Sequence, residues 1–261
     1  MVDKFMVQSA LLCDDYYIPD ANNLITEDDT PVDNFASDKQ QRLLVGSVYS
    51  SQPNLTFLAA ANVGIYHTVN EPAIVPDVFL SLDVQVPENW WAKQHRVYLV
   101  WNFGKPPEVA IEIVSNKEGN ELGDKLRIYE QMRVSYYVVY DPNRQLGEQV
   151  LRVYELRGRR YYETTETWLE QVGLGLMLWE GEFEGRHDVW LRWCYQDGTI
   201  LLTGDERALQ AEQRAQQAEQ IVQEERLEKE KQQQRAQQAE QRAELLAAQL
   251  RALGVNPDDI S

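Results

Sequence analysis

Two short apolar segments, each with a carboxylate among its aliphatic residues, constrain the fold of this chain more than any other feature. Residues 72–80 read PAIVPDVFL and contain Asp77, and residues 107–115 read PEVAIEIVS and contain Glu112. Runs rich in branched aliphatic residues are typical of buried strands, where a charge is costly unless a partner compensates it. Two carboxylates that converge on neighbouring strands would bind a hard divalent cation. A metal held in this way can hydrolyse phosphodiesters.

The pattern around these segments predicts an α/β body. Apolar residues at helical spacing predict a helix over residues 33–51, and apolar runs around residues 62–64 predict a hairpin over residues 55–69. Residues 121–133 have the pattern of an amphipathic helix. Strand, helix, strand between residues 108 and 140 predicts a crossover helix packed against a sheet. Further strands are expected at residues 74–82, 96–101, 149–156 and 161–164.

The chain changes in kind near Asp205. From there it is almost all Ala, Glu, Gln, Arg, Leu and Lys, without Gly or Pro until Gly254. Alternate steps of three and four residues from Ala208 reach fourteen positions, of which eleven are Ala, Val or Leu. One unbroken heptad register over this length predicts a coiled coil, and a single solvated helix is the alternative. We therefore expect a folded body over residues 1–204, a coiled-coil helix over 205–253 and a C-terminal tail over 254–261.

The charge of the body limits how it could bind nucleic acids. The net charge is −17, and the 57 residues from Asp205 hold 12 acidic and 8 basic residues, so the first 204 residues carry −13. Broad, nonspecific binding to nucleic acid needs Lys and Arg to displace counterions, and an acidic body argues against it. A local basic cleft remains compatible with this charge.

Cysteine usage and hydropathy indicate the compartment. Cys13 and Cys194 are far apart in the sequence and form neither a disulfide framework nor a zinc-binding spacing. The first residues lack the basic and apolar regions of a signal peptide, and no run of 18 apolar residues occurs. We therefore expect a cytoplasmic protein without a membrane partner.

Four sequence strings, taken in order, resemble a known family. They are residues 74–77 (IVPD), 112–115 (EIVS), 124–129 (DKLRIY) and 134–142 (VSYYVVYDP). Over roughly residues 30–195 the chain resembles the Uma family of restriction-endonuclease-like proteins, in the PD-(D/E)xK nuclease superfamily. The resemblance implies a restriction-endonuclease-like α/β (α+β) fold with a mixed four-stranded sheet flanked by helices. It also implies that Asp77 and Glu112 are metal ligands, that the carbonyl of Ile113 completes the shell, and that a lysine polarises the water or the phosphate. Oxygen ligands favour Mg²⁺ or Mn²⁺ over zinc.

One position departs from the superfamily motif. Val114 stands two residues after Glu112, where the motif has lysine. Lys117, in the loop after the strand, and Lys125, on the next helix, are the candidates for a displaced lysine, and we favour Lys125 because it lies in the DKLRIY string. Asp33 could supply an additional acid, although an ordinary acidic residue near a helix start is the simpler interpretation.

Each of these residues also has a purely structural interpretation. Asp77 could cap a turn after Pro76, Glu112 could be a buried carboxylate in a structural ion pair, and Lys125 could be a surface residue.

Three functions are compatible with the sequence. The first is a Mg²⁺-dependent DNA endonuclease that acts as a homodimer. The second is a catalytically weak or inactive nuclease-fold module that binds or scaffolds other proteins through its coiled coil, as the acidic body and Val114 suggest. The third is a nuclease acting on RNA or on a repair intermediate.

Overall fold

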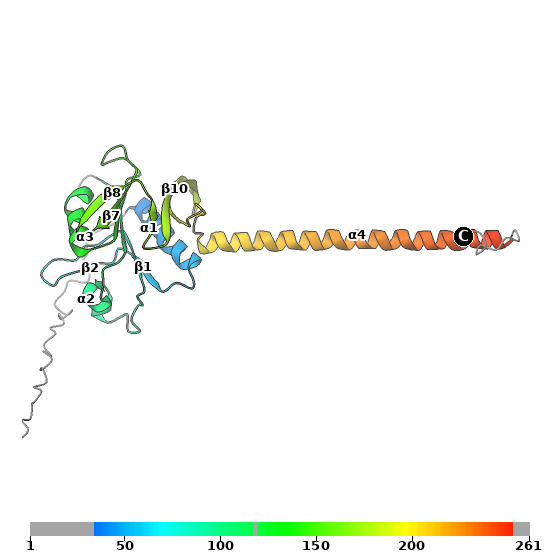
Figure 1. Ribbon diagram of the computed structural model, residues 1–261, viewed down its shortest axis with the longest axis horizontal. Coiled ribbons are helices and arrows are strands. Elements are labelled where there is room, and N and C mark those ends of the chain that lie inside the picture. Colours follow the sequence, from blue (N-terminus) through cyan, green and yellow to red (C-terminus); the bar gives the residue numbers. More distant parts are fainter. Residues whose placement is uncertain (1–33, 117–118, 253–261) are drawn as a thin grey trace, which may run out of the picture. The chain divides into compact units, whose positions relative to one another are not determined.

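The computed structural model describes residues 34–116 and 119–252, and the chain divides into two units at Gly204 (Figure 1). Asp33, Lys117 and the expected tail over residues 254–261 lie outside the described residues. The first unit contains the sheets and the short helices, and the second contains one long helix.

A six-stranded mixed sheet forms the centre of the first unit. Its strands, in spatial order, are β1 (Phe57–Ala61), β3 (Val78–Leu82), β5 (Val109–Ile113), β6 (Tyr136–Tyr140), β7 (Leu151–Arg157) and β8 (Arg160–Thr164). β5 and β6 are parallel and the other neighbours are antiparallel. The sheet has six strands where the resemblance implied four, because further strands extend it at its edges. The mixed α/β fold expected from the sequence is confirmed.

The connection between β5 and β6 is the crossover that the sequence predicted. It contains a π-helical turn, η3 (Glu121–Lys125), which leads directly into α3 (Leu126–Met132). Tyr129 and Met132 are buried, whereas Leu122, in the π-helical turn, is exposed. A parallel strand pair needs a long connection of this kind because its two strands run in the same direction.

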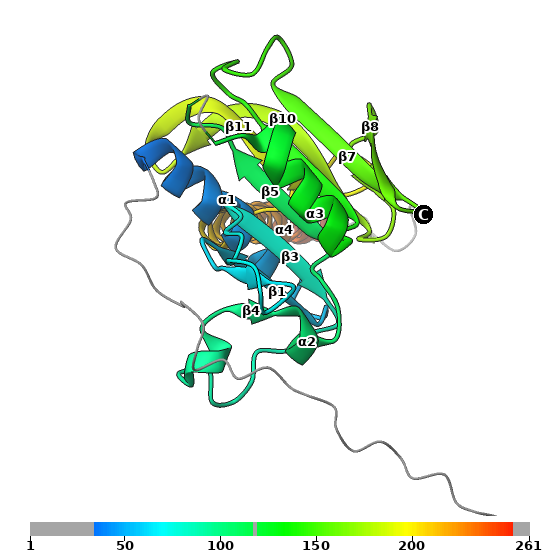
Figure 2. The same ribbon diagram turned by 90° about the vertical axis from the view of Figure 1, so that its left-hand side faces the viewer.

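The two faces of the sheet bury different clusters, and β5 contributes to both. Val109, Ile111 and Ile113 lie in one cluster, and Ala110 and Val114 lie in the other, as the two-residue period of a strand requires. α1 (Phe35–Ser51) covers the first face through Leu44 and Val48. α3 packs on the second face and lies in front of β5 in Figure 2.

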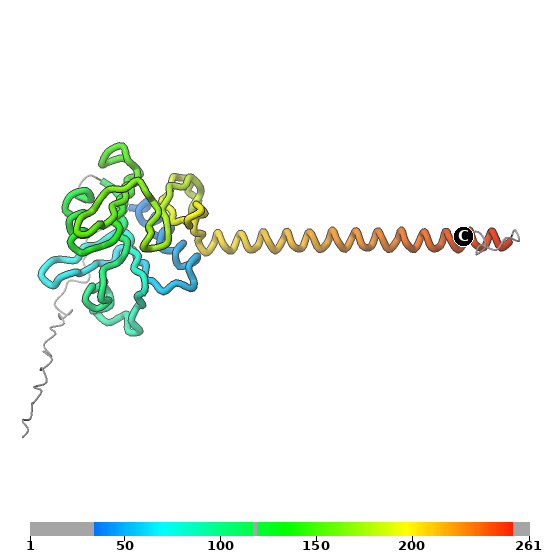
Figure 3. The backbone as a smooth tube through the Cα atoms, viewed as in Figure 1, coloured from blue at the N-terminus to red at the C-terminus, as the bar shows by residue number. Residues whose placement is uncertain are grey.

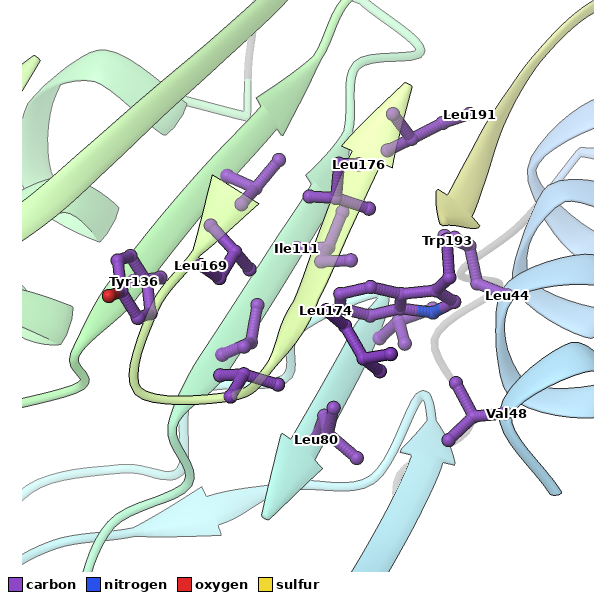
Figure 4. Packing of buried hydrophobic residues seen from close by; sticks show 14 of the residues in the cluster. Leu44, Val48, Leu80, Ile111, Tyr136, Leu169, Leu174, Leu176, Leu191 and Trp193 are labelled. Carbon is purple, nitrogen blue, oxygen red and sulfur yellow. The ribbon is translucent and has the colours of Figure 1, made fainter. Parts of the chain in front are cut away.

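A smaller sheet completes the first cluster. It consists of β9 (Trp168–Leu169), β10 (Leu174–Phe183) and β11 (Arg186–Cys194), with β10 in the centre. Figure 4 shows Leu174, Leu176 and Trp193 from this sheet beside Leu44 and Ile111. This sheet and α1 pack against the first face of β5, the strand that carries Glu112.

Two local predictions were wrong. No hairpin forms over residues 55–69: β1 pairs with β3, and β2 (Ile65–Tyr66) pairs in parallel with β4 (Tyr98–Leu99). Asn62, between β1 and β2, has a positive φ of 55°, which turns the chain away from the larger sheet. The strand expected at residues 96–101 is cut short, because β4 leads directly into α2 (Val100–Phe103). A short 3₁₀ turn, η2 (Lys93–His95), precedes β4.

The second unit is a single helix, α4 (Gly204–Ala252), of 49 residues. Figure 3 traces it without interruption. None of its residues is buried, and Val222 and Leu246 of the expected seam are among its exposed large apolar side chains. The predicted helix is confirmed, and its pairing into a coiled coil stays a prediction. Among the described residues, no helix is long and apolar enough to cross a membrane.

Candidate active site

Asp77 and Glu112 come together at one end of neighbouring strands. Asp77 directly precedes β3, Glu112 lies in β5, and Val78 is the register partner of Ile111. Val78 and Ile111 both belong to the cluster on the α1 face, so Glu112, the next residue of β5, faces α3. Asp77, just before β3, lies opposite Glu112 at the end of this strand pair. Asp77 Oδ2 accepts a hydrogen bond of 2.6 Å from the backbone N–H of Ile113, which fixes the aspartate beside the glutamate strand.

Glu112 is buried, with 1% of its surface exposed, and both of its carboxylate oxygens have partners. Lys125 Nζ donates to Oε2 over 2.8 Å, and the hydroxyl of Tyr129 donates to Oε1 over 2.7 Å. Lys125 ends the π-helical turn and Tyr129 lies one helical turn further along, in α3. Residues four apart lie on the same side of a helix, so one face of this segment supplies both donors.

Burial and neighbouring charges shift the pKa values of both Glu112 and Lys125. Burial raises the pKa of Glu112 to about 8, and the charge of Asp77 adds to this rise, whereas Lys125 and Tyr129 lower it. Burial lowers the pKa of Lys125, but the charge and hydrogen bond of Glu112 and the charges of Glu121 and Asp77 together outweigh that effect, so the pKa is raised overall. A buried acid of this kind gains from any cation that approaches it, because the cation offsets the loss of solvation.

The oxygen donors at this site suit a hard divalent ion. Among the described residues, no group of three or more His, Cys, Asp and Glu side chains could hold a metal. The carboxylates of Asp77 and Glu112 and the carbonyl of Ile113 would therefore supply part of a shell, with water and substrate oxygens supplying the rest. Mg²⁺ is bound in this way, through one or two carboxylates and several waters, so the donor set fits it.

The side chain of Val114 explains why the lysine is on the helix. Val114 is 1% exposed and belongs to the cluster under α3, and its backbone N–H donates to the carbonyl of Tyr140. A lysine at this position would bury its ammonium group among apolar side chains, at a high cost in solvation. Lys125 reaches the same carboxylate from outside this cluster.

Sequence reasoning missed Gln41, which lies on α1 and holds the other carboxylate. Its Nε2 donates to Asp77 Oδ1 over 3.0 Å, and its Oε1 accepts from Nδ2 of Asn62 over 2.9 Å. Gln41 is 3% exposed and lies near Leu44 in the helix. A polar residue on the buried side of an amphipathic helix was the signal that could have identified it.

Glu121 was also missed. It begins the π-helical turn, is 5% exposed, and places Oε1 at 3.8 Å from Nζ of Lys125. Its Oε2 has no hydrogen-bond partner within the described part of the chain. Lys125 therefore lies between two buried carboxylates, Glu112 and Glu121, and is closer to the first.

A cavity of about 450 Å³ opens at the ends of β5 and β6. Ile113 and Ser115 line it from β5 and the loop that follows, and the first turn of α1 lines another side. Lys39 and Arg186 add positive charge to its lining, and Asp188 adds one negative charge. The cavity is lined by Ile113, Val114 and Ser115, which follow Glu112, but its lining includes neither the two carboxylates nor Lys125, so it lies beside the candidate site and does not contain it.

A mixed α/β sheet with two carboxylates at one end of adjacent strands, and a lysine beside them from the crossover segment, is the arrangement expected for a restriction-endonuclease-like protein. The sequence matches the profile of the Uma2 family, described as "Putative restriction endonuclease", over residues 22–179. This match covers more than half of the chain, and the protein belongs to the Uma2 family.

Comparison with solved structures finds a "putative nuclease belonging to DUF820" from Anabaena variabilis. It is 14% identical, covers 53% of this chain and 72% of that chain, and superposes with a TM-score of 0.37. None of the curated proteins with which the sequence was compared is similar to it.

Proposed function

We propose that this protein is a Mg²⁺- or Mn²⁺-dependent endonuclease that hydrolyses phosphodiester bonds in DNA. The observation that carries the proposal is the buried carboxylate of Glu112, held 2.8 Å from the ammonium of Lys125 and next to Asp77. Family membership supports nuclease activity in general, and the donor set supports the choice of metal.

Each residue has a defined role in this proposal. Asp77, Glu112 and the carbonyl of Ile113 hold the metal, which when bound would polarise the scissile phosphate and lower the pKa of a water. Lys125 donates to the attacking water or to a phosphate oxygen and stabilises the negative charge that develops there.

Two further side chains keep the carboxylates in position. Gln41 orients Asp77, and Tyr129 orients Glu112, each through the hydrogen bond described above. These two contacts hold both carboxylates before substrate arrives, which is the condition for preorganised catalysis.

The acidic body favours local over extended contacts with DNA. The first 204 residues carry −13, so a DNA substrate would be held mainly by local contacts beside the carboxylates, where Lys125 contributes positive charge. In this proposal residues 1–204 carry out catalysis in the cytoplasm, residues 205–253 pair two copies into a homodimer, and residues 254–261 form a tail. Two sites in one dimer could cut both strands of a duplex.

The test is cleavage of supercoiled plasmid by purified protein with Mg²⁺, with Mn²⁺ and with EDTA. We expect metal-dependent nicking or linearisation by the wild type and by Asp124→Asn. Asp124 is an exposed neighbour of Lys125 and controls for changes in this turn. Asp77→Ala and Lys125→Ala should each lose activity by at least about 100-fold.

Equal activity in the wild type and Asp77→Ala would refute the catalytic proposal and indicate a contaminating nuclease. Single-stranded DNA and RNA, assayed in parallel, separate a DNA endonuclease from an enzyme acting on RNA or on a repair intermediate.

A second candidate function is a binding or scaffolding module with the nuclease fold. The valine at position 114, the acidic body and the fully exposed surface of α4 favour it. Removal of residues 205–261 discriminates between the two functions. A scaffold would lose its partner binding, whereas an endonuclease would keep metal-dependent phosphodiester hydrolysis, with fewer double-strand breaks.

A further inference from the structure

The helix α4 repeats charged residues at two fixed positions beside its seam. With Ala208 and Ala211 as the first two seam positions, a and d, arginine occupies position g at residues 207, 214, 235 and 242. Glutamate occupies position e at residues 212, 219 and 240. The heptad RAQQAEQ occurs identically at residues 214–220 and 235–241, three heptads apart. The charge pattern is therefore tied to the seam in two stretches, residues 207–219 and 235–242, and between them it is reversed, with Arg226 at position e and Glu228 at position g.

The arginines at position g and the glutamates at position e are not spaced to pair with each other within one helix. Side chains three or four residues apart are neighbours on a helix surface, as in the ion pair of Arg226 with Glu230. Arg207 and Glu212 are five residues apart, and so are the corresponding residues of the next heptad. They lie on opposite sides of the seam, where they would meet the residues of a second helix.

We propose that α4 pairs with α4 of a second copy of this chain, parallel and in register. In a parallel coiled coil, residue g of one helix lies beside residue e of the following heptad of the other helix. Arg207, Arg214 and Arg235 would then each face Glu212, Glu219 or Glu240 of the second copy. Two-fold symmetry doubles these three attractive pairs to six.

In an antiparallel pair of helices, like charges would face each other at these positions. In that arrangement g faces g and e faces e, so arginine meets arginine and glutamate meets glutamate near both ends of the helix. Like charges in these positions repel and select against the arrangement. The seam is mostly alanine, which buries little apolar surface, so the flanking charges have a large share in deciding the alignment.

The middle of the seam opposes parallel pairing. Glu225 and Lys229 occupy seam positions, and in a parallel pair each would face its own counterpart. Both side chains are long, and their stems can lie along the seam while the charged ends reach water. These two unfavourable layers lie near the centre of the helix, and the six favourable pairs lie on both sides of them. Pairing is thus expected to be weakest in the middle.

Parallel pairing has a consequence for the folded units. Each folded unit precedes α4 in the chain, so both units would be attached at the same end of the paired helices. Two candidate active sites could then act on one substrate molecule. This inference rests on the homodimer included in the proposed function, and it does not depend on catalysis.

Disulfide crosslinking of the purified full-length protein tests the alignment without metal or DNA. Ala211→Cys places a thiol in the seam, and Gln213→Cys, two residues away on position f, is its matched control. Under oxidising conditions we expect Ala211→Cys to form a covalent dimer in most of the sample. Gln213→Cys should not exceed the background set by the native cysteines in the wild type.

A dimer that crosslinks only when Ala211→Cys is mixed with Leu250→Cys, which would face it in a fully overlapping antiparallel pair, would overturn the parallel arrangement. A wild type that sediments as a monomer would overturn both the homodimer and its alignment. A dimer without any nuclease activity would leave this inference intact and refute only the catalytic proposal.

Charge reversal provides an independent measurement. Glu212→Arg, Glu219→Arg and Glu240→Arg combined should convert the dimer to monomer in sedimentation experiments. Arg207→Glu, Arg214→Glu and Arg235→Glu combined should do the same. An equimolar mixture of the two triple variants should recover a heterodimer. Unchanged dimerisation of either variant alone would overturn the role of the charges.

Discussion

Replacing Glu112 by glutamine should remove a large pH dependence of stability. Glu112 is 1% exposed, and burial raises its pKa from the ordinary value of 4.5 to about 8. Glutamine has nearly the same shape but does not ionise. The variant therefore keeps the packing around Lys125 and Tyr129, while the folded protein no longer has to hold a buried carboxylate charge.

The sign of the effect follows from proton binding in the two states. Between pH 4.5 and about 8 the folded wild type keeps a proton on Glu112 that the unfolded chain has released. The stability that this proton provides is fully present below pH 4.5 and is lost as the pH rises through 8. At about 1.4 kcal/mol for each pH unit, the full loss is about 5 kcal/mol, and about 2 kcal/mol of it falls between pH 6 and pH 7.5.

Urea unfolding of both proteins in EDTA, at several pH values from about 5 to 8.5, measures this loss. The free energy of unfolding of the wild type should fall relative to that of Glu112→Gln as the pH rises. Because only the difference between the proteins is used, other titrating groups largely cancel. Parallel pH profiles of the two proteins from pH 6 to 7.5 would show that Glu112 is already ionised, and would refute the reasoning.

Three shorter predictions concern the same site. Tyr129→Phe leaves Oε1 of Glu112 buried without its donor and should lower the free energy of unfolding by about 1–3 kcal/mol in urea titrations at pH 9. Mg²⁺ at about one hundred times its Kd should stabilise the wild type by about 2.7 kcal/mol in thermal unfolding, and Asp77→Asn should abolish this gain. Glu121→Gln should stabilise the metal-free protein by about 1 kcal/mol, because Oε2 of Glu121 is buried without a partner among the described residues. A destabilised Glu121→Gln variant would show that this carboxylate is instead required to hold Lys125.

The centre of the fold could be predicted from the sequence because its signals are local. The strand at Glu112, the helix at Tyr129 and the strand that follows are each marked by their own apolar period, and their order requires a crossover. The proximity of Asp77 and Glu112 follows from the pairing of β3 with β5, which two apolar segments of this kind suggest. Lys125 was favoured for its sequence string, and the structure brings it to Glu112.

The parts that were missed depend on contacts between distant residues. β2 and β4 pair over only two residues each, which is too short for any periodic signal. The contact of Gln41 with Asp77 joins residues 36 apart through the packing of α1. Such contacts depend on tertiary packing, so the pattern of nearby residues in the sequence indicates them only indirectly. For Gln41 that indirect indication is an amide on the same side of α1 as Leu44 and Val48.

The position of the lysine follows from how the crossover packs on the sheet. Side chains at positions 112 and 114 point to the same face of β5, and Val114 fills the cluster beneath α3 with Tyr129 and Met132. A positively charged partner for Glu112 must then come from outside this cluster, and the segment that connects β5 to β6 supplies it. A π-helical turn accommodates one more residue than an α-helical turn, and such turns often occur at functional sites. Here it sets Lys125 between Glu112 and Glu121, with the ammonium 2.8 Å from the first carboxylate and 3.8 Å from the second.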